Sequence, residues 1–161
     1  MKRLCYLLTA VLTAACSSID CPVQTKVTTQ YEVYDAGGVA YAIPDTFSVI
    51  SERKDGSDTI LLNMGVDQKS FSIPVSYSHP EDVLYFVFED SEANRYLVDT
   101  VWIKKDDIPH FESVDCQASF FHELKSVRHT TNAIDSIIIK NTTVDYDTKT
   151  VHFYLYPKID D

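Results

Sequence analysis

The residues of this chain that could carry out chemistry are its histidines, cysteines and acidic clusters. Cys116 could act as a nucleophile if His110 or His122 accepted its proton, because the thiolate is the reactive form. His122 opens a sequence like the H-E-x-x-H pattern of zinc hydrolases, but Ser126 stands where the second histidine belongs. His129 has a spacing from His122 that fits neither a helix face nor a zinc finger. The pattern predicts no catalytic residue and no metal site.

Acidic clusters give no stronger signal for a catalytic or ion-binding site. Residues 55–58 and 145–147 gather aspartates, but neither segment supplies the roughly six or more oxygen ligands that calcium takes. A carboxylate pair for glycoside hydrolysis cannot be chosen among 24 acidic residues without geometry. The chain contains no G-x-S-x-G, G-x-G-x-x-G or phosphate-loop pattern. We therefore expect a protein that is not an enzyme and that holds no cofactor.

The first sixteen residues have the order of an export signal. Two basic residues precede an apolar run over residues 4–12, and small residues lead to Cys16. The run is about half of the ~20 residues that a membrane-spanning helix needs. The cysteine at the cut resembles the lipobox of bacterial lipoproteins, although Thr13 replaces its usual leucine. This predicts a signal peptide over 1–15, lipidation of Cys16 and a lipidated tether over 16–24.

Charge and the residue after the anchor indicate where the mature protein resides. The chain has 14 basic and 24 acidic residues; losing Lys2 and Arg3 with the signal leaves 12 and 24, a net charge of −12. Such a charge repels nucleic acid and anionic lipid. The protein is therefore expected to attach to its membrane partner through the lipid on Cys16. The residue after the anchor is Ser17, and not the aspartate that retains lipoproteins at the inner membrane in enteric bacteria. We expect a monomer anchored in the outer membrane, on its periplasmic side or at the cell surface.

The remaining cysteines suggest a disulfide. Cys5 leaves with the signal and Cys16 is committed to lipid, so Cys21 and Cys116 remain. Because exported proteins meet an oxidising environment, these two are expected to pair and close a loop of about 95 residues. The catalytic thiol at Cys116 stays as the alternative.

Strand-like patterns fill the mature chain. Alternating apolar and polar residues begin at Lys26, and β-branched and aromatic runs recur between turn-forming clusters. This predicts one antiparallel β-sandwich over 25–161, immunoglobulin-like or similar, with about 8–9 strands. Residues 83–88 are apolar on both faces and should form a central strand. Residues 118–130 could form a helical face, but the β-rich surroundings favour a strand with a bulge.

An aromatic face near the C-terminus is the candidate binding surface. Alternation from Val151, Phe153 and Leu155 would send the intervening side chains to the opposite, outer side. That outer set is His152, Tyr154 and Tyr156, with Trp102 as a further member. Most other aromatic residues should be core.

Two stretches resemble a family of small lipoproteins of unknown function that is common in gut Bacteroidetes. They are residues 99–116, DTVWIKKDDIPHFESVDC, and residues 133–139, AIDSIII. The resemblance implies an envelope lipoprotein, with Cys116 paired to the cysteine near the tether, and it names no catalytic residue. In such bacteria Asp-Ser/Thr before an aliphatic residue resembles an O-glycosylation acceptor, which would make Thr59, Thr100 and Ser136 candidates.

Together these observations predict a lipid-anchored envelope protein that binds or scaffolds another envelope protein or a glycan. The alternative is a carbohydrate-binding or hydrolytic accessory protein with a carboxylate and histidine site. The two differ in structure: a binding module needs an apolar or aromatic patch, whereas an enzyme needs a cleft with carboxylates or a histidine of shifted pKa.

Overall fold

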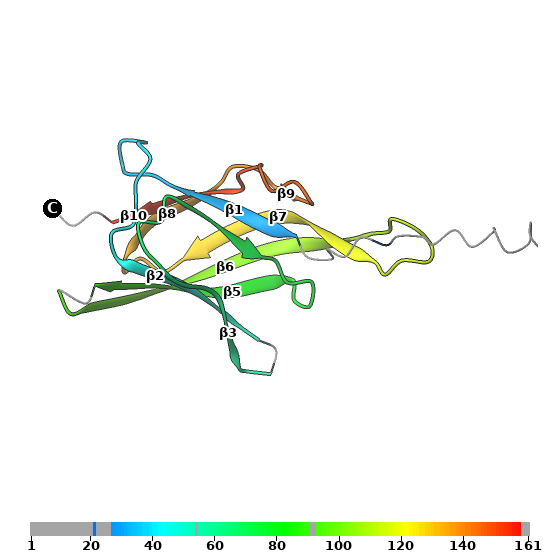
Figure 1. Cartoon of the computed structure of the whole chain (residues 1–161), viewed down its shortest axis with the longest axis horizontal. Coiled ribbons are helices and arrows are strands. Elements are labelled where there is room, and N and C mark those ends of the chain that lie inside the picture. Colours follow the sequence, from blue (N-terminus) through cyan, green and yellow to red (C-terminus); the bar gives the residue numbers. More distant parts are fainter. Residues whose placement is uncertain (1–20, 22–26, 54, 91–92, 159–161) are drawn as a thin grey trace, which may run out of the picture.

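The protein is an all-β sandwich of two sheets, described by a computed structural model for residues 21, 27–53, 55–90 and 93–158 (Figure 1). The strands in chain order are β1 (Thr28–Val33), β2 (Thr46–Glu52), β3 (Asp58–Gly65), β4 (Ser70–Pro74), β5 (Glu81–Asp90), β6 (Arg95–His110), β7 (Ser119–His129), β8 (Ile134–Ile139), β9 (Thr143–Val144) and β10 (Phe153–Pro157). Within these described residues, no helix is long and apolar enough to span a bilayer.

One sheet has four strands in the order β4-β1-β10-β8, and the other has six in the order β3-β2-β5-β6-β7-β9. All neighbours pair antiparallel except β1 and β10, which run parallel with Tyr31 opposite Phe153. β5 lies inside the larger sheet, as its apolar sequence predicts. The all-β sandwich is thus confirmed.

Aromatic rings from both sheets fill the space between them. Alternation on β1 turns Tyr31 inward, where its ring stacks on Phe71 at 4.6 Å and on Phe153 at 4.8 Å. Phe47 and Phe86 of the larger sheet meet edge to face at 5.5 Å in the same core. Burial of each such side chain stabilises the fold by roughly 1.5–3 kcal/mol.

The β6–β7 hairpin projects beyond the two sheets at one end of the molecule (Figure 1). Its pairing runs from Val101 opposite His129 to His110 opposite Ser119. One extra residue, Lys125, interrupts the register opposite the Lys104/Lys105 step. Within residues 118–130, Ser119–His129 therefore form a strand with a bulge, as expected.

The disulfide is also confirmed: Cys21 bonds to Cys116 in the β6–β7 connection, with 5.5 Å between their Cα atoms. Two details of the predicted fold differ. The described residues form ten strands, because the two-residue β9, too short to leave a pattern, adds to the expected number. The last strand begins at Phe153, two residues after Val151, where the predicted alternation starts.

Candidate functional site

Four ionisable side chains from three adjacent strands meet where the β6–β7 hairpin leaves the sandwich. The alternation that buries Val101 and Ile103 on β6 also directs Lys105 inward. The Nζ atom of Lys105 donates to Asp107 Oδ1 at 3.1 Å and lies 3.7 Å from Asp82 Oδ1 of β5. The side chain of Lys105 is 0% exposed, so this cation is enclosed between two carboxylates.

His122 of β7 completes this charged cluster, which we define as Asp82, Lys105, Asp107 and His122. It lies opposite Asp107 in the strand register, and its Nδ1 atom is 2.7 Å from Asp107 Oδ1. Burial lowers the pKa of His122, and the Lys105 charge adds to this effect against the opposing pull of Asp107. His122 is therefore neutral at pH 7, and the nearby carboxylate selects the tautomer in which Nδ1–H donates. The lone pair of Nε2 remains as an acceptor.

Of the two carboxylates in the cluster, Asp82 has the weaker hydrogen bonds. Burial raises its pKa to about 6, with a contribution from the Asp107 charge, although Lys105 and the Ser76 amide act in the opposite direction. Its Oδ2 atom accepts a long hydrogen bond of 3.4 Å from Ser76 N. Asp82 thus changes its charge close to neutral pH.

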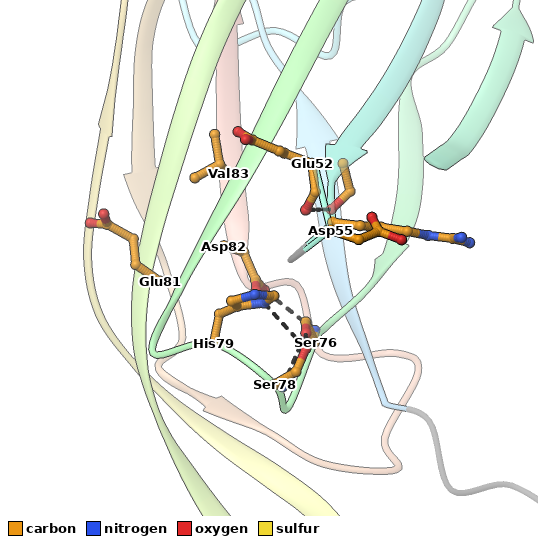
Figure 2. Close-up of a pocket in the computed structure, with 10 residues that line it drawn as sticks. Glu52, Asp55, Ser76, Ser78, His79, Glu81, Asp82 and Val83 are labelled. Atoms are coloured by element: carbon orange, nitrogen blue, oxygen red, sulfur yellow. Dashed lines mark hydrogen bonds between the residues drawn. The ribbon is translucent and has the colours of Figure 1, made fainter. Parts of the chain in front are cut away.

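Two clefts meet at Asp82. The larger, with a volume of about 710 Å³, lies between the β2–β3 and β4–β5 connections, and most residues that line it are of polar or charged type, including Glu52, Asp55 and His79 (Figure 2). The smaller, of about 230 Å³, has apolar walls that include Leu84. Ser51, Ser76 and Asp82 line both, and His122 lines the smaller one.

The β4–β5 connection separates these clefts and is held in place by hydrogen bonds. Ser78 N donates to Ser76 Oγ at 3.1 Å, and the Ser78 hydroxyl is 3.2 Å from His79 Nδ1. In Figure 2 these side chains lie beside Asp82. Lys105 Nζ donates to the His79 carbonyl at 2.7 Å, and Lys105 N donates to Pro80 O at 3.0 Å. The buried lysine therefore fixes the wall that both clefts share.

The predicted aromatic face does not exist as one surface. Tyr154 and Tyr156 are half-buried on β10, where their rings lie 4.8 and 6.2 Å from the ring of Tyr34. Trp102 lies on β6 in the other sheet, beneath the Arg128 guanidinium at 4.5 Å. Tyr154 and Tyr156 thus lie in one sheet and Trp102 in the other.

The prediction for His152 is wrong, because this residue is buried. It precedes β10, so the alternation of that strand does not extend to it. Its Nδ1 atom accepts from Gln30 N at 3.0 Å, and its Nε2 atom lies 3.1 Å from Thr143 O. The side chain of His152 thus joins β1 to β9 and takes no part in a surface.

The other predicted positions are placed as follows. Cys16, like the rest of 1–20, lies outside the described residues. Thr59, Thr100 and Ser136 lie within β3, β6 and β8 and are half-buried, and the Thr59 hydroxyl oxygen is enclosed. O-glycosylation of these residues stays a prediction. Cys116 is bonded to Cys21, which excludes it as a free thiol nucleophile.

No motif or spacing in the sequence pointed to Asp82, Lys105 and Asp107 as site residues. A signal was present in the alternation Val101, Ile103, Lys105, which places a lysine at an inward position of a strand. Among the residues that the structure describes, no group of three or more His, Cys, Asp or Glu side chains could hold a metal ion.

A family model matches residues 46–157, which includes all four members of the charged cluster. The chain belongs to a family of unknown function, DUF6452. The matched region extends from the first residue of β2 to the last of β10 and leaves out β1. No curated protein and no solved structure matches the chain. Membership of DUF6452 therefore assigns no activity to the charged cluster or to the clefts beside it.

Proposed function

We propose that this DUF6452 protein is a lipid-anchored envelope protein of the outer membrane that binds a glycan without catalysing its conversion. The observation that carries the binding proposal is the junction of the two clefts at Asp82. There a cleft lined mostly by polar and charged residue types and a smaller cleft with apolar walls meet beside a carboxylate and a neutral imidazole. Apolar walls with a few convergent polar groups are typical of ligand sites.

The chemistry of the junction favours a ligand that donates hydrogen bonds. The His122 Nε2 lone pair and the Asp82 carboxylate both accept, so hydroxyl or N–H groups are the matching partners. A sugar ring offers hydroxyls for these acceptors and a C–H face for the apolar wall, where Tyr77 and Phe120 stack at 5.0 Å. Acidic side chains such as Glu52 and Glu81 line the larger cleft and disfavour an anionic ligand.

The hydrogen bonds around the cluster support binding rather than catalysis. Lys105 contacts Asp107 and lies near Asp82, so its Nζ atom is already engaged by the two carboxylates. Ser76 Oγ, one of the hydroxyl groups that line the smaller cleft, interacts with the Ser78 hydroxyl at 2.7 Å and accepts from Ser78 N. A nucleophile activated by His122 would need to hydrogen-bond its imidazole.

Glycan binding can be tested with the full exported chain on an array of neutral oligosaccharides, followed by calorimetric titration of the best ligand. We expect Asp82→Asn to weaken binding about tenfold, since hydrogen bonds to charged groups contribute roughly 1.5–3 kcal/mol. Glu89→Gln is the matched control, because Glu89 is exposed at the far end of the same strand, and it should bind like the wild type. Equal affinity of both variants would contradict the assignment of this site.

Hydrolysis is the second candidate function, and one observation favours it. The Asp107–His122 pair, with 2.7 Å between carboxylate and imidazole, is the arrangement by which a neutral histidine is oriented as a general base. Product release from the bound oligosaccharide distinguishes the two candidates. Under the binding proposal neither wild type nor His122→Gln releases product. Release by the wild type that is lost in His122→Gln would establish hydrolysis instead.

The lipid anchor has a direct test. Motivated by the apolar run that ends before Cys16, we expect mass spectrometry of the native N-terminus to show an acylated Cys16. An N-terminus at Ser17 or Cys21 would disprove the anchor and leave the cleft proposal standing.

A further inference from the structure

The end of the β6–β7 hairpin presents apolar side chains to solvent. Val114 is 98% exposed, Phe111 63% and Ile108 47%. A hydrogen bond of 3.2 Å from Cys116 N to Ser113 O closes a turn with Val114 inside it, so its side chain projects from the end of the hairpin. We call these three residues the hairpin tip. Apolar side chains grouped at one projecting point mark a contact with a partner or a membrane.

The disulfide connects this tip to the N-terminal segment. Cys116 lies two residues after Val114 and is bonded to Cys21. Only five peptide units separate Cys21 from Cys16, and an extended chain covers at most about 18 Å over that length. Whatever path these residues take, acyl chains on Cys16 would hold the hairpin tip close to the bilayer surface. The tip also lies at the end of the molecule opposite the C-terminus (Figure 1).

We infer that the hairpin tip inserts its apolar side chains into the interfacial region of the bilayer that holds the lipid anchor. This inference rests on the proposed lipidation of Cys16. The tip then provides a second attachment beside the acyl chains, and two attachments fix how the sandwich is oriented on the membrane. The clefts at the base of the hairpin would thereby keep a defined distance from the lipid.

The charges around the tip define the lipid surface that it fits. Glu112 and Asp115 flank the apolar residues, and His110 Nε2 lies 3.1 Å from Glu112 Oε1. Acidic groups are repelled by anionic headgroups, so the tip should enter a zwitterionic surface in preference to an anionic one. A protein partner of the tip is the alternative occupant, and the test must separate it from lipid.

The experiment places an indole at the tip of the full chain, exported and acylated, in vesicles of brominated phosphatidylcholine. The variant is Val114→Trp in a Trp102→Phe background, which removes the only native tryptophan. Val39→Trp in the same background is the matched control, because Val39 is 64% exposed in the β1–β2 connection, away from the hairpin. Neither substitution affects a buried side chain, so both proteins should fold.

We expect the indole at position 114 to lose about half or more of its emission, since interfacial groups lie roughly 5–10 Å into the headgroup and acyl boundary. The indole at position 39 should keep its emission. Equal quenching at both positions, or none at position 114, would overturn the inference. A protein would then be the expected partner of the hairpin tip. Mass spectrometry of the same sample reports the acylation of Cys16 separately. An unacylated terminus would overturn the anchor, and this inference with it.

Discussion

Asp99 and Asp82 are both buried in the six-stranded sheet, but their surroundings differ. Asp99 of β6 accepts four hydrogen bonds: Oδ1 from Thr130 Oγ1 at 2.5 Å and Asn132 N at 2.7 Å, and Oδ2 from Ala133 N at 2.6 Å and Ile134 N at 2.8 Å. Burial acts to raise the pKa of Asp99, yet these donors outweigh it and the pKa is lowered. Asp99 therefore stays charged and holds the β7–β8 connection against β6.

Asp82 has one long hydrogen bond, from Ser76 N, and one cation at 3.7 Å. Because these do not compensate for burial, its pKa is raised to about 6. The comparison teaches that burial alone does not identify a functional carboxylate. The number of hydrogen-bond donors around the carboxylate separates the two roles. An aspartate whose oxygens all accept hydrogen bonds within the fold is structural, whereas one with unused acceptor capacity beside a cleft can bind a ligand.

Removing the cation beside Asp82 should produce the largest effect. Lys105→Met leaves the Asp82 and Asp107 carboxylates uncompensated and should lower the free energy of unfolding by about 3–5 kcal/mol at pH 7 in urea titrations. Part of this loss should disappear at pH 5, where Asp82 takes up a proton. Lys125→Met is the control, because its 3.1 Å ion pair with Asp106 is exposed and contributes about 0–1 kcal/mol. Equal losses in both variants would contradict the charged cluster.

Removing each aspartate tests the comparison directly. Asp99→Ala leaves three backbone N–H groups without an acceptor and should cost about 3 kcal/mol of unfolding free energy. Asp82→Ala should cost about 1 kcal/mol or less, since burial already disfavours its charge and Lys105 keeps Asp107 as a partner. The measurement is chemical denaturation at pH 7. Similar losses at the two positions would show that the donor count does not separate their roles.

The two carboxylates should also affect pH dependence with opposite signs. The folded pKa of Asp82, about 6, exceeds its unfolded value of about 3.9. Its contribution is therefore fully present below about pH 4 and is lost as the pH rises to 6, by about 2 kcal/mol. Asp99 has a lowered pKa, so its contribution is present above its unfolded pKa and is lost as the pH falls.

Denaturation of Asp82→Asn and Asp99→Asn between pH 4 and 7 measures these contributions as differences from the wild type. The stability of Asp82→Asn should increase relative to the wild type as the pH rises through this range, whereas that of Asp99→Asn should stay nearly level, because the Asp99 contribution is lost only below about pH 4. A difference for Asp82→Asn that does not change with pH would mean that its pKa is not raised.

The local sequence pattern was sufficient to predict most strands, because period-two alternation depends only on neighbouring residues. It also identified 118–130 as a strand, where Lys125 forms the bulge. Local pattern failed for His152, because this residue precedes β10 and the alternation of the strand does not reach it. The parallel pairing of β1 with β10 joins segments more than a hundred residues apart, which no local pattern encodes.

The candidate site was harder to predict than the fold for the same reason. Asp107 and His122 become neighbours only through the β6–β7 register, and Asp82 joins them only because β5 pairs with β6. The disulfide could be predicted because cysteine count and compartment leave few choices. Twenty-four acidic residues leave too many choices for a carboxylate site.

Thr130 allows the smallest and sharpest test of why Asp99 differs from Asp82. Its hydroxyl donates to Asp99 Oδ1 and accepts from Thr100 N at 2.9 Å. Thr130→Val keeps the shape of the side chain but removes this donor, so unfolding free energy should fall by about 1 kcal/mol. The pKa of Asp99 should also rise, which carboxyl NMR titration would detect. Thr130→Ser retains the hydroxyl and should keep the wild-type pKa. If Val and Ser gave the same Asp99 titration, the hydroxyl would not be among the donors that hold Asp99 charged.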